Sequence, residues 1–542
     1  MVKLLKVIFV IGALAILIPG QVSAQETNNK YGIHIFDEND LPEAATLVNS
    51  SGGEWGYVTV VIREDERDSA RWQRAFNQMR RLKLIPIVRI ATKMNNSHWE
   101  EPTKEEAINW AGFLNSLNWP VKTRYIVLFN EPNHAKEWGG KIDPISFAKL
   151  TKHYYETLKG FSGDFFIMAG ALDLAAPNSV STMEASRFFD QMYSEDNFIF
   201  TLFDALASHS YPNPGFSASP SDSGRTSIKG YKWEIDYLEN FGMDPDIPVF
   251  ITETGWINSK DNLDENYKAA FREAWTEPQI VAVTPFLLSY SDAPFDVFSW
   301  KNPETAEFLP HYYSVQSITK IKGKPEQIHS FKLESHEIAD YLVSDSEYLF
   351  SINLKNTGQS IWDSNDGFKL LAESTMKPQN IKISGISKVE PGQTAKVGIR
   401  LTTNEPRGIH SISIALYKDE QKLSDVLSTQ FTLVSPPSVN ISANFLLGDG
   451  HGLSLLMYDA DMLVTRLENL SLVNGSSSIA SIKNVIPNKN YRFVLSKPYY
   501  LSANRETKLL VGTTNIDFGI LLPIPYVLSH FANPLAWIVH FL

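Results

Sequence analysis

The chain of 542 residues contains no cysteine, so disulfide bridges, thiol nucleophiles and cysteine–zinc sites are excluded. Its 12 histidines are scattered, without the paired spacing of a zinc-binding helix, and no glycine-rich loop of the kind that cradles phosphate is present. We therefore expect neither a metal nor a cofactor. Positive charge is also in deficit: the net charge of −12, with no basic stripe, argues against nucleic acid as a partner.

The N-terminus has the pattern of an export signal. Lys3 and Lys6 precede an apolar stretch at residues 7–18, and small residues lead to a cleavage position after Ala24. The apolar stretch is short for a membrane-spanning helix, so a cleaved signal peptide at residues 1–24 is favoured over an uncleaved anchor. An exported chain without disulfides suits a bacterial protein that is extracellular or associated with the cell envelope.

The length predicts about three domains, and the first shows a regular alternation of strand-like and helix-like runs. The expected strands are 31–36, 56–63, 85–91, 125–130, 165–171, 205–209, 249–253 and 281–289. The expected helices include 69–83, 104–117, 145–161, 231–241 and 266–275. This alternation predicts an α/β fold, a (β/α)8 TIM barrel, at residues 31–325. A doubly wound open sheet alternates in the same way, but no glycine-rich turn follows the first strand, so the closed barrel is preferred.

The rest of the chain reads as two all-β, sandwich-like domains. Residues 331–434 show short strands and turns without long helices, and a second β-rich domain is expected at 440–517 after a Ser-Pro linker. In the first of these, the segment from Asn356 to Trp362 resembles an immunoglobulin-like module, with a turn followed by a tryptophan that plugs the core. We expect structural spacers, with carbohydrate binding as the alternative.

The C-terminal tail, residues 518–542, contains no Asp, Glu, Lys or Arg. Its length suits a hydrophobic membrane anchor, whereas its three prolines and the lack of a following basic residue suit a packed terminal segment. The sequence leaves both readings open.

Two short motifs carry the chemistry. Glu131 lies in Phe129-Asn130-Glu131-Pro132, and Glu253 lies in Ile251-Thr252-Glu253-Thr254-Gly255-Trp256. Each follows an apolar run, so each glutamate comes at the C-terminal end of an expected strand, the fourth and the seventh. Because a buried, unpaired glutamate is costly and the strand ends of a barrel converge at one face, both should face a common cleft. Two such carboxylates, about 5–5.5 Å apart, are what retaining glycoside hydrolysis requires.

These two motifs together resemble the large clan of retaining (β/α)8-barrel glycoside hydrolases, which contains cellulases, mannanases and β-xylosidases. Asn130-Glu131-Pro132-Asn133 is most similar to the β-xylosidase and exopolysaccharide-hydrolase branch, and the resemblance covers about residues 31–321. It implies that Glu131 is the acid/base and Glu253 the nucleophile. It also implies that Asn130 binds the sugar 2-hydroxyl, a contact that strengthens in the transition state.

Four other polar residues are candidates for the substrate site. His209 and Tyr211 end the sixth expected strand, and the resemblance implies that they hold the nucleophile, the alternative being a core histidine and an aromatic turn residue. Arg63 and Arg89 end the second and third strands. One of the two is expected to orient the nucleophile; the alternative for each is a salt bridge at the barrel rim, and the sequence does not choose between them.

Loop tryptophans suit a glycan cleft because the apolar C–H faces of sugars stack on indoles. Trp256 and Trp300 are the two expected to bind substrate in this way. For Trp99 and Trp138 simple packing is an equal alternative, and for His34 a structural role leads.

The sequence therefore predicts an exported O-glycosyl hydrolase that degrades a β-linked oligo- or polysaccharide by retaining double displacement. Two rivals remain: a non-catalytic surface glycan-binding or adhesion protein, and a transglycosylase that uses the same two glutamates. The glycan, its linkage and the choice between exo and endo action lie beyond the sequence.

Overall fold

The computed structural model describes residues 28–95, 97–259, 261–302 and 304–524, and the chain divides into two compact units, Met1–Gln327 and Ile328–Leu542. The predicted signal peptide lies outside the described residues. Among the described residues no helix is both long and apolar enough to cross a membrane.

The described part of the first unit contains eight parallel strands in two sheets, ordered β1-β2-β3-β6-β7 and β8-β9-β10. The strands are β1 (Gly32–Ile35), β2 (Gly56–Arg63), β3 (Leu84–Ala91), β6 (Arg124–Leu128), β7 (Phe165–Ala169), β8 (Leu206–His209), β9 (Val249–Glu253) and β10 (Ile280–Val283). Single parallel bridges join the sheet edges, Tyr31 to Val283 and Asp173 to His209. The strands therefore follow one another around a closed ring, and each expected strand is present; the eighth is much shorter than predicted.

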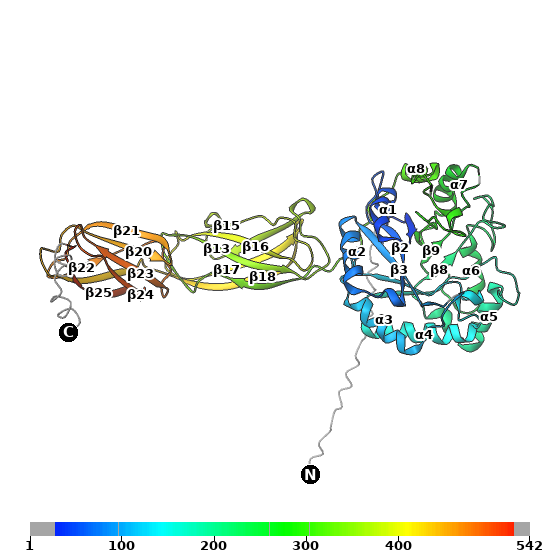
Figure 1. The fold of residues 1–542 in the computed structure, drawn as a ribbon, viewed down its shortest axis with the longest axis horizontal. Helices are drawn as coiled ribbons and strands as arrows, with labels where there is room; N and C mark the ends of the chain where they lie inside the picture. Colours follow the sequence, from blue (N-terminus) through cyan, green and yellow to red (C-terminus); the bar gives the residue numbers. More distant parts are fainter. Residues whose placement is uncertain (1–27, 96, 260, 303, 525–542) are drawn as a thin grey trace, which may run out of the picture. The chain divides into compact units, whose positions relative to one another are not determined.

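Helices cover the outside of this ring (Figure 1). They are α1 (Leu41–Val48), α2 (Ser69–Arg81), α3 (Lys104–Ser116), α4 (Pro144–Phe161), α5 (Ala185–Glu195), α6 (Gly230–Glu239), α7 (Leu263–Ala269) and α8 (Pro310–Gln316). Their starts follow from local chemistry: the Asp68 carboxylate accepts two backbone N–H groups at the start of α2, and Asp143 caps α4 with a proline in its first turn. The predicted helix 266–275 is instead α7 followed by one π-helical segment, Ala270–Ala274.

Two apolar clusters hold the ring. The larger packs the helices against its outer surface, and a smaller one fills its interior. Side chains along a strand alternate between the two clusters. In β9, Phe250 belongs to the interior cluster, whereas Val249 and Ile251 belong to the outer one. The C-terminal ends of the strands are left free to carry polar groups.

The second unit holds two sandwiches in sequence. The first pairs sheet β11-β13-β16-β15 with sheet β12-β18-β17-β14, and the second pairs β22-β19-β25 with β21-β20-β23-β24. The strands of the first are β11 (Phe331–His336), β12 (Tyr341–Val343), β13 (Glu347–Asn356), β14 (Phe368–Ser374), β15 (Ile381–Ile383), β16 (Thr394–Thr402), β17 (Gly408–Lys418) and β18 (Gln421–Val434). Those of the second are β19 (Ser438–Phe445), β20 (Leu453–Asp459), β21 (Met462–Leu470), β22 (Ser476–Ile479), β23 (Asn490–Ser496), β24 (Ala503–Lys508) and β25 (Thr513–Leu521). Each sandwich encloses its own apolar core.

The predicted boundary of the C-terminal tail at residue 518 is wrong. Strand β25 continues to Leu521, and the side chains of Phe518 and Leu521 are buried in the second sandwich. These apolar residues alternate with more exposed ones, as expected for a strand that covers a core. The remainder of the predicted tail, from residue 525, lies outside the described residues.

Trp362 is fully buried in the first sandwich, as predicted, where it lies in the same apolar cluster as Phe350 and Ile399. We expect Trp362→Ala to destabilise this sandwich by about 3–5 kcal/mol, because the indole leaves a cavity that the surrounding strands only partly close. Trp362→Phe should lose less stability than Trp362→Ala, because the phenyl ring fills part of the same space. The measurement is limited proteolysis of the full chain in increasing urea, with the cleavage sites mapped by mass spectrometry. Equal resistance of residues 331–434 in wild type and Trp362→Ala would contradict the core role.

Candidate active site

The two glutamates singled out by the sequence lie at the same end of the strand ring. Glu253 is the last residue of β9, and Glu131 lies three residues beyond β6. The backbone of the Glu131 segment is unusual, since Phe129 has φ 70° and Glu131 φ 30°. Non-glycine residues rarely adopt positive φ, so this segment needs support from its neighbours.

That support comes from the residues that follow β7. The Glu131 N–H donates to the carbonyl oxygen of Ala171 at 3.0 Å. Beside it, a Cβ on Gly170 would lie 2.7 Å from the Leu128 carbonyl oxygen and 3.0 Å from that of Phe129. Only glycine fits this position without displacing the segment that carries Glu131.

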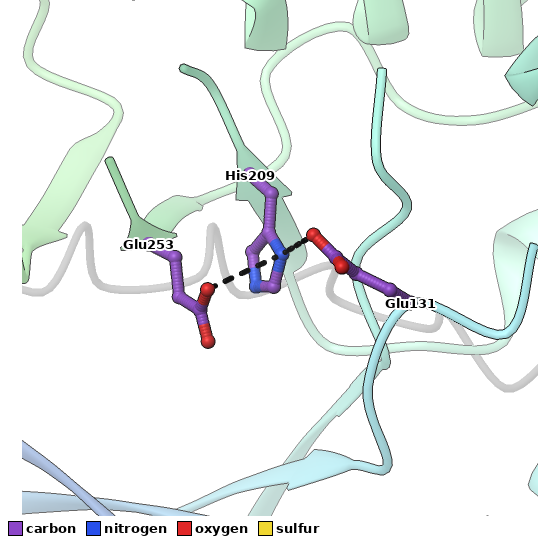
Figure 2. A group of neighbouring side chains, drawn as sticks. All are labelled: Glu131, His209 and Glu253. Carbon is purple, nitrogen blue, oxygen red and sulfur yellow. Dashed lines mark hydrogen bonds and ion pairs between the residues drawn. The ribbon is translucent and has the colours of Figure 1, made fainter. Parts of the chain in front are cut away.

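His209, at the end of β8, lies between the two glutamates (Figure 2). Its Nδ1 is 2.8 Å from Glu131 Oε1 and 3.8 Å from Glu253 Oε2. One carboxylate oxygen of each glutamate and a ring nitrogen of His209 all lie within 4.8 Å of one another. Burial opposes charge on His209, but the carboxylates of Glu253 and Glu131 outweigh it and raise its pKa. The predicted approach of both glutamates to one point is therefore present.

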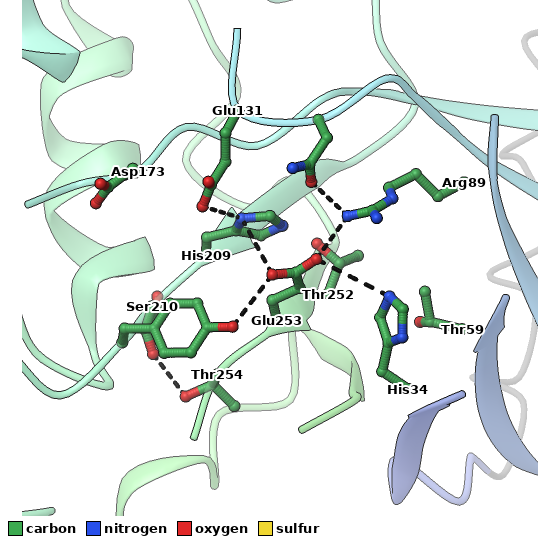
Figure 3. A network of polar contacts seen from close by, with 12 residues as sticks. His34, Thr59, Arg89, Glu131, Asp173, His209, Ser210, Thr252, Glu253 and Thr254 are labelled. Atoms are coloured by element: carbon green, nitrogen blue, oxygen red, sulfur yellow. Dashed lines mark hydrogen bonds and ion pairs between the residues drawn. The ribbon is translucent and has the colours of Figure 1, made fainter. Parts of the chain in front are cut away.

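Glu253 is 7% exposed and is held by hydrogen bonds from two side chains, with His34 and His209 nearby (Figure 3). Arg89 Nη1 donates to its Oε1 at 2.6 Å, and the Tyr211 hydroxyl donates to its Oε2 at 3.1 Å. Burial alone raises a carboxyl pKa, but the charges of His209 and Arg89 prevail and hold the pKa of Glu253 below its usual value. Glu253 is therefore ionised at neutral pH, and Tyr211 contacts it as the resemblance implied.

Asn130 lies in the same hydrogen-bond network. Its Oδ1 accepts from Arg89, and its Nδ2 donates to Glu137 Oε2 at 3.4 Å. Burial and the charge of Glu131 raise the pKa of Glu137. The side-chain amide is thus oriented from both sides, as a group must be if it is to bind one particular hydroxyl.

His34 approaches Glu253 from β1, with Nε2 3.9 Å from Oε1. Burial lowers the pKa of His34 to about 3, so the ring is neutral at pH 7 and the contact is not an ion pair. Neither ring nitrogen has a hydrogen-bond partner among the described residues. An unpaired buried donor is costly.

For three residues that were predicted to bind substrate, the surroundings in the structure contradict the prediction. Arg63 is 39% exposed and pairs with Asp65 at 3.1 Å, the rim salt bridge that was its alternative. Trp256 is 2% and Trp300 1% exposed, and both rings pack on Tyr267. An indole buried in this way has no free face for a sugar, and its packing removes apolar surface from water.

Two polar residues of the site were missed. Asp173 follows β7 and pairs with His134 at 2.8 Å; burial opposes both charges, yet their hydrogen bond raises the pKa of His134 and lowers that of Asp173. The rule that selected the two glutamates, a polar residue just beyond a strand, also selects Asp173. Glu234 lies in α6 on the same face as Tyr231, Ile235 and Leu238, and this helical spacing was the available signal.

The trio of Glu131, His209 and Glu253 is also the one group of donors, in the described part of the chain, close enough to hold a metal ion. The guanidinium of Arg89 already neutralises Glu253 at 2.6 Å. A cation placed there would be repelled by this fixed charge, so the donor set favours acid–base and nucleophilic chemistry over a metal site.

Residues 86–278 match a family model described as the glycosyl hydrolase catalytic core. The matched segment includes Arg89, Glu131, His209 and Glu253, so it contains the whole cluster around the two carboxylates. The match supports a glycoside hydrolase core in this part of the chain. No curated protein matches the chain in sequence.

Three solved structures show partial likeness. An endo-β-1,4-glucanase from Xanthomonas axonopodis pv. citri is 10% identical, with 53% of this chain and 98% of that chain covered and a TM-score of 0.37. A GH30 endoxylanase from Clostridium papyrosolvens C71 is 10% identical, with 84% and 95% covered and a TM-score of 0.35. A β-mannanase from Thermomonospora fusca is 16% identical, with 54% and 91% covered and a TM-score of 0.35. With values this low, these likenesses carry no argument about activity.

A buried polar network lies behind the strand that carries His209. Ser208 donates to the Glu234 carboxylate and lies 2.8 Å from the Ser210 hydroxyl, and the Thr254 hydroxyl donates to the Ser210 carbonyl oxygen at 2.6 Å. Since Ser208 and Ser210 flank His209 in sequence, the network fixes the end of β8 against α6 and against the residue after Glu253. Glu234 is 1% exposed, and burial raises its pKa to about 8.

The raised pKa of Glu234 predicts how the stability of the folded chain changes with pH. Because the folded chain binds a proton at Glu234 more tightly than the unfolded chain does, Glu234 costs stability as the pH rises from about 4.5 toward 8. Glu234→Gln keeps the acceptor without the charge. We therefore expect the free energy of unfolding of the variant, relative to that of wild type, to increase by on the order of 2 kcal/mol from pH 6 to pH 9.

The measurement is the free energy of unfolding of the first unit, within the full chain, from urea titrations at both pH values. Glu234→Ala serves as the contrast, because it leaves Ser208 without its acceptor and should be less stable at both. The same pH dependence in wild type and Glu234→Gln would contradict a proton on Glu234.

Proposed function

We propose that the first unit is a (β/α)8-barrel glycoside hydrolase that cleaves a β-linked glycan by retaining double displacement. One observation carries the proposal: oxygens of Glu131 and Glu253 lie within 4.8 Å of each other at the C-terminal ends of the strands. Retaining enzymes hold their two carboxyl groups at about 5–5.5 Å, whereas inverting enzymes leave about 6.5–9.5 Å for a water molecule. The short spacing favours retention.

The reaction then runs in two steps. In the first, Glu131 gives its proton to the glycosidic oxygen as that oxygen leaves the anomeric carbon, and a Glu253 oxygen forms an ester bond to the same carbon. In the second, Glu131 takes a proton from water, and the water oxygen displaces Glu253. Both carboxyl groups return to their starting states, and the product keeps the configuration of the substrate.

The surroundings of the two glutamates suit these roles. Arg89 and Tyr211 hold one oxygen each of Glu253 and favour its ionised form, as a nucleophile requires. His209 Nδ1 contacts the carboxyl group of Glu131 and so orients it. We expect Asn130, whose Oδ1 accepts from Arg89, to bind the 2-hydroxyl of the sugar in the site.

The N-terminal pattern and the second unit extend the proposal. The basic start and apolar stretch of residues 1–24 support export of the enzyme by a bacterium, to the medium or the envelope. The two sandwiches support a spacer role that holds the catalytic unit near polymer or cell surface. The mass of the mature chain, secreted by a bacterial host, tests cleavage after Ala24.

The first test of the proposal is reducing-sugar release from β-1,4-glucan, β-1,4-mannan, β-1,4-xylan and β-1,3-glucan. We expect Glu253→Gln to lower kcat by more than about 10³-fold and Glu131→Gln by about 10²–10⁴-fold, because each removes one reacting carboxyl group. Glu239→Gln, an exposed carboxylate on α6, is the matched control and should keep wild-type rates. Binding of a glycan without cleavage, unchanged by either site variant, would point to the adhesion reading instead.

The stereochemistry is tested separately by proton NMR of the first product formed. A β-anomer at early times is expected for double displacement. An α-anomer would exclude a covalent intermediate on Glu253. Products lengthened on an added acceptor sugar would mark the enzyme as a transglycosylase.

The pH profile tests the role of Arg89. Since the charges of His209 and Arg89 lower the pKa of Glu253, Arg89→Ala should raise it, and the acid limb of kcat/KM should move up by about 1 pH unit or more. Tyr211→Phe removes a neutral donor and should move the limb less. A fall in kcat with the acid limb in place would mean that Arg89 acts only by positioning.

A further inference from the structure

A cavity of about 750 Å³ lies at the same end of the strand ring as the two glutamates, between the loops that follow β1 and β10. Its walls include Phe36, Asp37 and Asp40 from the first loop and Tyr290 and Ser291 from the second. Pockets that hold small ligands span about 300–1,000 Å³. None of its lining residues belongs to the cluster around Glu131 and Glu253, so it is a separate space; we call it the rim cavity.

The rim cavity adjoins the nucleophile through a short chain of contacts. The Phe36 ring, which lines the cavity, lies 5.2 Å from the ring of His34, and His34 Nε2 lies 3.9 Å from Glu253. In the strand ring, β10 lies between β9, which ends at Glu253, and β1, which leads to Phe36. The cavity and the nucleophile proposed for the reaction therefore lie on neighbouring parts of the same end of the strand ring.

Aromatic rings form one side of the cavity. Phe36 is 37% exposed, and its centroid lies 5.2 Å from that of the half-buried Tyr290 at a tilt of 56°. The Phe295 ring contacts that of Tyr290, with the two centroids 6.0 Å apart. Exposed aromatic faces suit the C–H faces of a sugar, and these two rings offer the surface that the buried Trp256 and Trp300 do not.

The charges of the cavity discriminate among sugars. Its two cations are already engaged: Arg71 donates to Glu38 at 2.6 and 2.8 Å, and Lys301 donates to Glu43 at 3.0 and 3.1 Å. Asp37 and Asp40 add carboxylate acceptors, which suit sugar hydroxyls and repel a uronate. The lining therefore favours an uncharged sugar over an anionic one.

We propose that the rim cavity is a subsite that stacks and hydrogen-bonds a further, uncharged sugar unit of the glycan cut between Glu131 and Glu253. This inference rests on the proposed function. It makes Phe36 and Tyr290 determinants of chain-length preference, separate from the residues that react.

The test compares long and short substrates. For wild type and variants, kcat/KM is measured on the hexaoses of β-1,4-glucose, β-1,4-mannose and β-1,4-xylose, and on the matching 4-nitrophenyl β-glycosides. Tyr290→Ala and Phe36→Ala should each lower the hexaose-to-aryl-glycoside ratio by about three- to tenfold, the value of one stacking contact. Tyr290→Phe should keep most of the ratio, because it keeps the ring.

Phe198→Ala is the matched control, since this exposed phenylalanine lies before β8, at the opposite end of the strands. An unchanged ratio in both Tyr290→Ala and Phe36→Ala, in an enzyme that cleaves the hexaose, would overturn the subsite while leaving the proposed function intact. Two separate variants guard against misfolding of either one.

Calorimetric binding to Glu253→Gln tests the charge preference. The preferred hexaose should bind at least about tenfold more tightly than its C6-oxidised form, in which each primary alcohol has become a carboxylate; for xylose, which lacks that alcohol, a glucuronate-substituted hexaose replaces it. Equal binding would overturn the preference for uncharged sugars. If wild type cleaves no glycan tested, the proposed function fails, and hexaose binding to wild type then decides the subsite: affinity lost in Tyr290→Ala supports it, and no binding overturns it.

Discussion

The negative charge of Glu253 is the constraint on which the site depends. A carboxylate that is 7% exposed loses most of its hydration, and an isolated one would become neutral rather than stay charged. Arg89 at 2.6 Å and Tyr211 at 3.1 Å replace that hydration. These partners come from β3 and from the end of β8, so the charge is stable only where distant strands converge. The closed ring of strands is thus a requirement of the chemistry as well as a fold.

The second carboxyl group is held by a different means. Glu253 ends a regular strand, whereas Glu131 lies on a segment with positive φ that is held from the side by Ala171 and by the space that Gly170 leaves. A nucleophile must stay in place and charged, while an acid/base must reach a leaving oxygen and later a water molecule. The rigid strand end and the separately supported loop suit the two roles proposed for Glu253 and Glu131.

The sequence predicted the strands and both glutamates because an apolar, β-favouring run that stops at a polar residue is a local signal. It did not separate Arg89 from Arg63, because both end strands, and what distinguishes them is the neighbour each side chain reaches in three dimensions: Glu253 for one and Asp65 for the other. The burial of Trp256 and Trp300 was equally hidden, since a loop sequence does not tell which face of an indole is covered. Such non-local contacts come only from the fold.

The same reasoning separates chemistry from selectivity in this unit. Of the two glutamates of the proposed reaction, Glu131 follows β6 and Glu253 ends β9. His209 contacts Glu131, whereas Arg89 and Tyr211 hold the buried charge of Glu253. Phe36 and Tyr290 lie on loops after β1 and β10. Phe36 contacts the His34 ring directly, and Phe286 and Phe298 link Phe36 to Tyr211. If the rim cavity is the subsite proposed for it, substitutions there change the sugar contacts and leave the hydrogen bonds from Arg89 and Tyr211 to Glu253 in place. On the proposed function, we therefore expect the substrate range to depend on the loops after β1 and β10 and the reaction itself to depend on the groups around Glu253.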